Sequence, residues 1–409
     1  PVMVWLHGGA FAVGSGFDPM TDPSLLALHG DVVVVSLNHR LNALGYLYLG
    51  ALHDDFADSG NCGHLDIVLA LQWVRDNIVA FGGDPGNVTI FGESGGGAKV
   101  GALLGMRPAR GLFHKAIEQS GPAARLVDRS DAAMIAELTL RALGIAKTDV
   151  HKLQTLDWQT VVAAASGVRL ASGAPGLTER TLAPCVDGRS IPAHPFSPLA
   201  TDLSSEVPLM IGTTRDEWTQ MLSLDKRFGN MAADDARRFF TTYLGDAATD
   251  AYEFYRASLP SDDPSYWVSA FLTDLVMRTG SIVTADRKAA QNKAPVFMYR
   301  VDFEPDVMNR MLRSTHSIDV PLVFGNLQPP ELIGTGPVVD ELSRAMMQAW
   351  INFARTGDPS SGDLAWPHYD PAERLTMVFD AVSEVRPDPD RAARLFWEAK
   401  NVELVQGHA

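Results

Sequence analysis

The sequence predicts an α/β protein whose largely parallel central sheet is flanked by helices. Short runs of β-branched and aromatic residues alternate with longer segments in which apolar residues recur at helical spacing, and this alternation is typical of strands joined by crossover helices. The run 31–37 contains four consecutive valines, which favours a strand buried on both faces of a parallel sheet. A glycine-rich turn directly after the run 88–91 lies where such sheets bind their ligands.

Seven segments have strand character, and the longer segments between them supply the helices. The expected strands are 1–6, 31–37, 88–91, 113–121, 207–213, 295–301 and 375–379. Apolar spacing predicts a helix over 61–80 and an amphipathic helix over 342–355, which ends at the stop signal 356–359. The residues of the first helix expected to face the sheet are Leu65, Val68, Leu69, Leu71 and Trp73.

The chain is expected to form one domain over residues 1–409, because no repeat, low-complexity linker or charged block divides it. Residues 122–203 and 218–292 lack comparable strand runs, so we interpret both as mainly helical insertions over the sheet. The chain begins inside what should be a core strand, and we expect the first strands of the fold to lie upstream. Without them the run 32–37 would form an open edge, so we expect a chain starting at Pro1 to aggregate or to show little activity.

Composition favours a globular protein with a large core and argues against two classes of partner. Hydrophobic residues make up 46% of the chain and charged residues 20%. The net charge of −15 and the lack of a Lys/Arg-rich tract argue against nucleic-acid binding. The apolar runs are far shorter than the roughly 20 residues that a membrane-spanning helix needs, so we expect no membrane span.

The two cysteines, Cys62 and Cys185, lie far apart without a C-x-x-C pair or a cluster of His and Cys. We therefore expect neither a disulfide framework nor a zinc site. This cysteine usage mildly favours a reducing compartment, and a cytoplasmic location is the corresponding expectation.

Ser94 is the candidate nucleophile. The strand run 88–91 leads into Gly92-Glu93-Ser94-Gly95-Gly96, which fits the pattern G-x-S-x-G. A serine at such a strand-to-helix turn presents its hydroxyl to a cleft, and the N–H groups at the start of the following helix favour negative charge there. An ordinary serine in a glycine-rich turn has the same five letters, so the surrounding sequence has to decide between the two interpretations.

The loop 7–11, HGGAF, is the candidate oxyanion loop. It follows the first expected strand, and hydrolases with a G-x-S-x-G turn take one oxyanion N–H from a loop of this kind and another from the residue after the serine. A plain turn between strand and helix is the alternative. Because both halves of the oxyanion site occur in the expected order, the catalytic interpretation is favoured.

Glu217 and His316 are the candidate acid and base. A serine hydroxyl becomes a good nucleophile when a histidine takes its proton, and an acid must orient that histidine. The order serine, acid, histidine is typical of this elbow, and Glu217 and His316 follow Ser94 in that order. Asp216 and Asp319 are the alternative acids. Ser120 lacks flanking elbow glycines on both sides, so we expect a buried, hydrogen-bonded serine there.

Taken together, these motifs resemble those of the type-B carboxylesterases, the carboxylesterase and cholinesterase family of α/β-hydrolases. The resemblance covers nearly the whole chain. The matching segments are HGGAF at 7–11, NHRLNALGYL at 38–47, WVRDNIVAFGGDPGNVTIFGESGG at 73–96, TTRDE at 213–217 and HSIDVPLVFGN at 316–326. The chain departs from the family pattern at Gly95, commonly alanine, at Trp218, commonly glycine, and before HGGAF, where the family has further residues.

The resemblance implies an α/β-hydrolase fold with helical insertions that roof a gorge above the serine. It also implies a serine carboxylesterase that cleaves small-molecule carboxylic esters through an acyl-enzyme, without metal or cofactor. The implied site residues are Ser94 as nucleophile, Glu217 as orienting acid, His316 as base, and Gly9, Ala10 and Gly95 as donors of oxyanion N–H groups.

Two other functions are compatible with the same scaffold. A catalytically silent adhesion or binding module would retain the fold, but such proteins usually lack a triad member, and this sequence contains all three. A lipase would act at an oil–water surface, and burst kinetics on soluble esters would argue against it. The nature of the ester is not encoded in the motifs, because the insertions shape the substrate pocket.

Overall fold

An eight-stranded sheet forms the centre of the computed structural model, which describes residues 1–168, 170–171, 179–180, 182–328, 330–362 and 364–400. The strand order is β10-β9-β8-β7-β4-β3-β1-β2, and all neighbouring strands are parallel except β9 and β10. The strands are β1 (Val2–Leu6), β2 (Val33–Ser36), β3 (Val88–Glu93), β4 (Lys115–Gln119), β7 (Leu209–Thr214), β8 (Val296–Val301), β9 (Leu375–Phe379) and β10 (Glu384–Pro387). The predicted, largely parallel α/β sheet is confirmed, and β10 is an addition to it.

The side chains of β1 show how the sheet divides the core. Because successive residues of a strand point to opposite faces, Val2, Val4 and Leu6 join one hydrophobic cluster while Met3 and Trp5 join the other. All five are at most 2% exposed. A strand covered on both faces therefore needs apolar residues at every position, without alternating polar ones.

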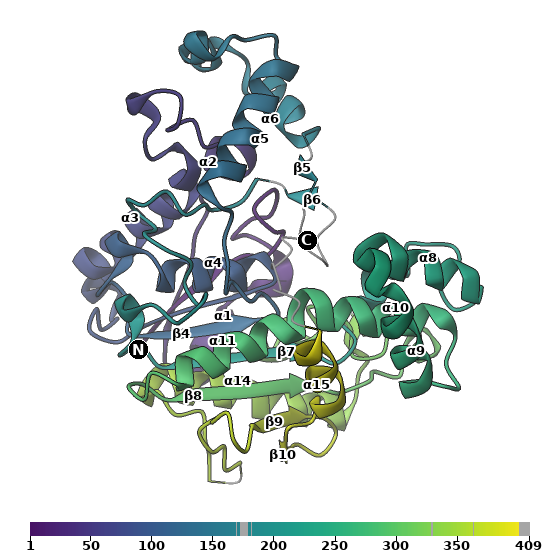
Figure 1. Ribbon diagram of the computed structural model, residues 1–409. Helices are drawn as coiled ribbons and strands as arrows, with labels where there is room; N and C mark the ends of the chain where they lie inside the picture. The colour runs from purple at the N-terminus through teal and green to yellow at the C-terminus, as the bar shows by residue number, and fades with distance from the viewer. Residues whose placement is uncertain (169, 172–178, 181, 329, 363, 401–409) are drawn as a thin grey trace.

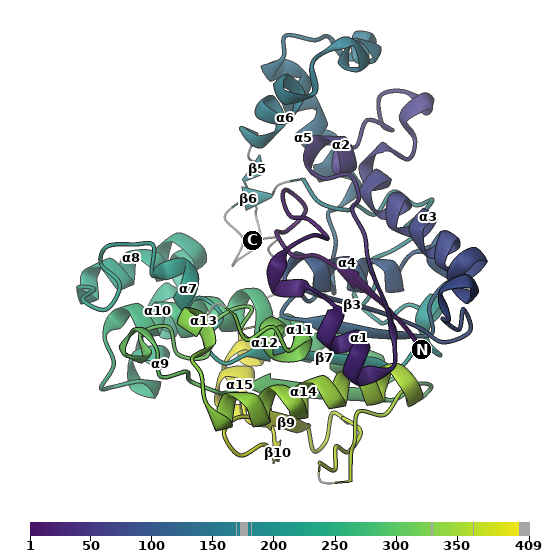
Figure 2. The same cartoon turned by 180° about the vertical axis from the view of Figure 1, so that it is seen from behind.

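Helices cover both faces of the sheet (Figures 1 and 2). One face carries α3 (Cys62–Asn77), α4 (Gly95–Leu104) and α11 (Thr279–Ala289). The other carries α1 (Ser24–Gly30), α12 (Asp319–Phe324) and α14 (Pro337–Thr356). Among the helices of the described residues, none has both the length and the apolar character to cross a bilayer.

The buried face of α3 differs from the predicted one. Leu69 and Trp73 were expected to face the sheet, but they are 65% and 47% exposed. The buried positions are Gly63, His64, Ile67, Val68, Leu71 and Val74. Their spacing of three and four residues follows the helical period, and it includes a histidine that hydropathy alone would place outside.

Strand β2 lies at the end of the sheet and pairs only with β1 among the described strands. All four of its residues, 33–36, are partly exposed. The prediction that this valine run is buried on both faces is therefore wrong. An end strand has one uncovered side, so its valines pack against β1 and α1 while keeping contact with solvent.

The two expected insertions form separate groups of helices beside the sheet, except that α11, the last helix of the second, lies on a face of the sheet (Figure 1). Within 122–203 lie α5 (Arg129–Ala142), α6 (Trp158–Ser166), a 3-10 segment η6 (Lys147–Thr155) and the short strands β5 (Leu170–Ala171) and β6 (Glu179–Arg180). Within 218–292 lie α7 (Thr219–Leu222), α8 (Ala233–Leu244), α9 (Ala248–Ser258), α10 (Pro264–Thr273), a π-helical turn (Asp274–Arg278) and α11. The remaining helices are α2 (Asn42–Tyr46), α13 (Pro330–Ile333) and α15 (Arg391–Ala399).

Each insertion has its own hydrophobic core. Phe240, Phe271 and Trp267 belong to a cluster that joins α8, α9 and α10 to Trp397 of α15. A smaller cluster holds α5 and α6 against α2 and the loop that follows it. Each group is thus stabilised by apolar burial of its own, in addition to its contact with the sheet.

Glu118 on β4 leads to a prediction about stability. Its carboxyl group is fully buried, and neither oxygen has a hydrogen-bond partner among the described residues. Burial raises the pKa of Glu118 well above its ordinary value, so the folded protein keeps a proton that the unfolded chain loses near pH 4.3. Stability contributed by this group therefore falls as the pH rises above about 4.3.

We expect Glu118→Met to stabilise the fold, because methionine fills a similar volume without a buried acid. The gain should be larger at pH 7.5 than at pH 4.5, as measured by urea unfolding at both pH values. A variant that is less stable than the parent at pH 7.5 would show that Glu118 has a stabilising partner.

Candidate active site

Ser94 occupies the sharp turn between β3 and α4. Its backbone has φ 57° and ψ −124°, a strained conformation for a residue with a side chain. The turn is tight: a Cβ atom on Gly96 would lie 2.0 Å from the carbonyl oxygen of Leu6, so only glycine fits there. The predicted nucleophile elbow is therefore the observed local structure, and the Ser94 side chain remains partly exposed to a pocket.

The HGGAF loop lies against the first residue of α4. A Cβ atom on Gly95 would approach the backbone of Ala10 to between 2.3 and 2.5 Å, which shows how closely the two segments pack. As the first residue of α4, Gly95 has an N–H group without a partner inside the helix. Ala10 and Gly95 line the same pocket as Ser94, whereas Gly9 lines a neighbouring pocket together with Glu93.

Glu217 and His316 form a short, buried hydrogen bond. Nδ1 of His316 lies 2.5 Å from Oε2 of Glu217. The second oxygen of Glu217 accepts the hydroxyl of Ser120 and the backbone N–H of Thr214, both at 2.7 Å. Burial opposes ionisation, but the charge of His316 and these hydrogen bonds outweigh it and lower the pKa of Glu217. Ser120 is thus buried and hydrogen-bonded, as the sequence analysis predicted.

The second imidazole nitrogen of His316 faces another carboxylate. Nε2 lies 3.2 Å from Oε1 of Glu93, and the hydroxyl of Ser317 donates to the same oxygen at 2.6 Å. Burial lowers the pKa of His316, but Glu93 and Glu217 together raise it above its ordinary 6.5. The structure therefore brings Glu217 and His316 together, as predicted for the acid and the base. Among the described residues, however, His316 shares no hydrogen bond with Ser94, and its Nε2 faces Glu93 instead.

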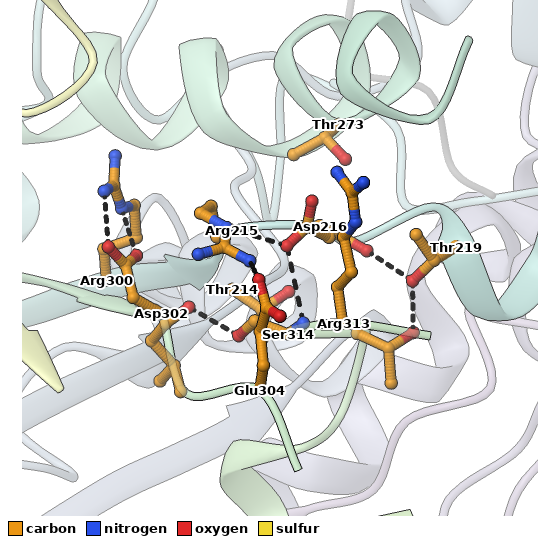
Figure 3. Close-up of polar contacts among 12 residues, drawn as sticks. Thr214, Arg215, Asp216, Thr219, Thr273, Arg300, Asp302, Glu304, Arg313 and Ser314 are labelled. Atoms are coloured by element: carbon orange, nitrogen blue, oxygen red, sulfur yellow. Dashed lines mark hydrogen bonds and ion pairs between the residues drawn. The ribbon is translucent and has the colours of Figure 1, made fainter. Parts of the chain in front are cut away.

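The loops that carry the acid and the base are tied to each other (Figure 3). The backbone N–H of Asp216 donates to the carbonyl of Ser314 at 2.9 Å, and the hydroxyl of Thr219 donates to that of Thr315 at 2.9 Å. These bonds flank Glu217 on one loop and precede His316 on the other. Hydrogen bonds on both sides of Glu217 therefore hold its carboxylate at a fixed distance from the imidazole of His316.

The alternative acids have other partners. Asp216 bonds to Arg215 at 2.8 Å, and Arg215 also pairs with Glu304 (Figure 3). Asp319 accepts hydrogen bonds from Gln119 and from the hydroxyl of Tyr299, each at 2.9 Å. Neither carboxylate occupies the place beside Nδ1 of His316, which belongs to Glu217.

Lys99 is a buried cation beneath the HGGAF loop, and the sequence analysis did not single it out. Its side chain is fully buried, and Nζ donates to the carbonyl of His7 at 2.7 Å while lying 5.8 Å from the centre of the Phe11 ring. Burial lowers the pKa of Lys99 to about 7. Burial and the charge of Lys99 also lower the pKa of His7 to about 4. The loop is therefore fastened to α4 by one buried amine.

Sequence reasoning missed Glu93 and Lys99 for different reasons. Glu93 is the variable position of G-x-S-x-G, so only its place beside the serine signalled a role. Lys99 follows Ser94 by five residues in an otherwise small and apolar helix, where a lysine is unusual. Glu93 and Lys99 could both have been identified as candidate site residues, because each is a charged residue in an otherwise apolar or glycine-rich stretch.

The sheet, the elbow at Ser94 and the acid–base pair define a protein of the α/β-hydrolase class. The chain belongs to the Carboxylesterase family, whose model matches residues 1–397. The family and fold expected from the sequence are thereby confirmed, and the protein is a serine carboxylic ester hydrolase.

Similar proteins carry esterase and hydrolase names. The chain is 38% identical over 398 residues to the para-nitrobenzyl esterase of Bacillus subtilis (strain 168), with 96% of this chain and 78% of the relative covered. It is 32% identical to the phenmedipham hydrolase of Pseudarthrobacter oxydans, with 95% and 77% covered. The solved carboxylesterase EST55 of Geobacillus stearothermophilus superposes with a TM-score of 0.84 at 37% identity, over 97% of this chain and 82% of that one.

Lys99 leads to a prediction about the oxyanion loop. Replacement by methionine keeps the buried volume but removes the bond to the carbonyl of His7. The oxyanion donors would then be held less firmly, so we expect Lys99→Met to lower kcat, by less than the roughly hundredfold that loss of an oxyanion donor itself costs. Initial rates on a soluble ester measure this, with the thermal unfolding temperature as a control for folding. An unchanged kcat in a folded variant would mean that the loop holds its geometry without Lys99.

Proposed function

We propose that this protein hydrolyses uncharged carboxylic esters through an acyl-enzyme formed on Ser94. The observation that carries the proposal is the buried pair of Glu217 and His316 at the same end of the sheet as the strained serine. Glu217 orients the imidazole and stabilises its charged form. Gly9, Ala10 and Gly95 are the proposed donors of the oxyanion N–H groups.

In the acylation half-reaction, the imidazole of His316 takes the proton of the Ser94 hydroxyl as the serine oxygen attacks the ester carbonyl. For this step Nε2 exchanges its contact with Glu93 for one with Ser94. The oxyanion of the tetrahedral intermediate is stabilised by the loop N–H groups and by the start of α4. The imidazolium then gives its proton to the leaving alcohol, and the acyl group remains on the serine.

In the deacylation half-reaction, water replaces the alcohol. His316 takes a proton from water as the water oxygen attacks the acyl carbonyl, and a second tetrahedral intermediate forms in the same oxyanion site. Its collapse releases the carboxylic acid and returns the proton to Ser94. The pair of steps needs no group beyond the chain itself and water.

The walls of the Ser94 pocket support an uncharged substrate. Phe11, Ala98, Pro122, Val276 and Met277 line it, and none of these side chains carries a charge. Val276 and Met277 come from the π-helical turn 274–278 of the second insertion. Apolar walls with a few convergent polar groups are typical of pockets for small apolar ligands, so we propose small soluble esters rather than long-chain lipids as substrates.

Covalent labelling tests this proposal. A fluorophosphonate probe should modify Ser94 alone, because only an activated serine beside an oxyanion site reacts readily. Ser94→Ala should abolish labelling and lower kcat at least about a thousandfold, since triad members act as a unit. Peptide mapping by mass spectrometry identifies the site, and a p-nitrophenyl ester supplies the rate.

The parent protein should also show a burst of p-nitrophenol equal to the enzyme concentration if deacylation is the slower step. Label found on another serine, or normal turnover by Ser94→Ala, would contradict the assignment of the nucleophile. A panel of esters with varied acyl and alcohol chains then measures the chain-length preference.

A further inference from the structure

Two histidines and an aspartate from distant parts of the sequence meet where the loop after α2 lies against η6 of the first insertion. Asp55 lies in a short 3-10 turn (Asp54–Phe56), and His53 is the residue just before this turn. His151 lies on η6. One ligand atom from each residue can be chosen so that all three atoms lie within 4.8 Å of one another. The group lies outside the residues of the ester-hydrolysing site described above.

The geometry of this group fits a small divalent cation. Oδ2 of Asp55 lies 3.6 Å from Nδ1 of His53 and 3.6 Å from Nε2 of His151. A tetrahedral zinc ion with bonds of about 2.0–2.1 Å to nitrogen and oxygen requires ligand atoms roughly 3.4 Å apart. Two of the three separations are already within a few tenths of an ångström of that value.

The imidazoles are held in place by apolar contacts. The rings of His53 and His151 lie edge to face with centroids 4.6 Å apart, and the Phe56 ring lies 5.1 Å from His151. Phe56 packs against the hydrophobic cluster that includes the buried residues Val150 and Leu153. The backbone on either side of the group is thus anchored, so an ion would have to order mainly the three exposed side chains.

The donors are available to an ion from solution. The side chains of His53, Asp55 and His151 are 46%, 68% and 47% exposed. Nδ1 of His53 accepts the backbone N–H of Asp55 at 3.2 Å, so this nitrogen is unprotonated, and an incoming ion would take its lone pair in place of that hydrogen bond. The neighbouring cation Lys152 is paired with Asp149 at 2.6 Å, which limits its repulsion of an incoming metal.

We propose that His53, Asp55 and His151 form a binding site for a divalent transition-metal ion. Two imidazoles and one carboxylate suit Zn²⁺, Ni²⁺ or Cu²⁺ better than Mg²⁺ or Ca²⁺, which prefer oxygen ligands. Water would complete the coordination shell on the exposed side. The ion would join the loop after α2 to η6 and so fasten the outer part of this insertion.

The proposed site departs from the expectation that the chain carries no zinc site. That expectation was based on cysteine spacing and on clusters along the sequence. His53 and His151 are far apart in the chain, and only the packing of the insertion brings them together. A search of the sequence by motif spacing could not find them.

Metal titration of the tag-free protein tests the site. Isothermal titration calorimetry with ZnCl₂ should show saturable binding near one ion per chain, and His53→Gln and His151→Gln should each weaken it at least tenfold. His29→Gln is the matched control, because His29 is an exposed histidine on α1, and it should bind zinc like the parent. Co²⁺ should give visible absorption bands in the parent that His151→Gln abolishes.

Thermal unfolding supplies a second readout. An ion that binds only the folded chain raises the unfolding temperature by mass action, so ZnCl₂ should raise it in the parent and in His29→Gln but not in His151→Gln. Absence of saturable zinc binding to the parent would overturn the proposal. Zinc binding in His53→Gln and His151→Gln that is as strong as in the parent would also overturn it, because the ion would then occupy another part of the protein.

Discussion

The proposed site of this esterase depends on the buried hydrogen bond between Glu217 and His316. Glu217 is fully buried, and a carboxylate there is tolerated because it accepts bonds from His316, Ser120 and Thr214. Ser120 comes from the end of β4, Thr214 from the end of β7, and His316 from the loop after β8. One carboxylate therefore joins three segments, and the proposed catalytic arrangement depends on the order of the strands that deliver them.

The parallel sheet explains why these segments meet. Neighbouring parallel strands end at the same edge, and the order β7-β4-β3-β1 places the acid loop, Ser120, the elbow of Ser94 and the HGGAF loop along that edge. The edge also gathers buried charge: His316 faces Glu93 as well as Glu217, and Asp319 lies near both. The carboxylates stabilise the imidazolium that forms when His316 takes a proton, and they also raise the pH at which the free imidazole becomes available as a base.

Much of the proposed site could be selected from the sequence because its residues stand in local motifs with a fixed chain order. Ser94 has its elbow, the HGGAF loop follows a strand, and the order serine, acid, histidine selected Glu217 and His316. The burial of individual side chains, which depends on where an element lies in the fold, was harder to predict from the sequence. The four valines by themselves favoured a strand buried on both faces, yet β2 is partly exposed at the open edge that was expected for the run 32–37. Leu69 and Trp73 are apolar but face solvent, while His64 on the same helix is buried.

The variant Glu217→Gln tests directly whether Glu217 orients His316 and stabilises its charged form. Glutamine keeps the shape of the side chain but removes the charge that orients and stabilises the imidazolium, so kcat should fall by about 10³–10⁴-fold while the circular dichroism spectrum stays unchanged. The pH at which the residual activity rises should also move to lower values, because loss of this carboxylate lowers the pKa of His316. A folded Glu217→Gln variant with a kcat close to that of the parent and an unmoved pH profile would contradict the account.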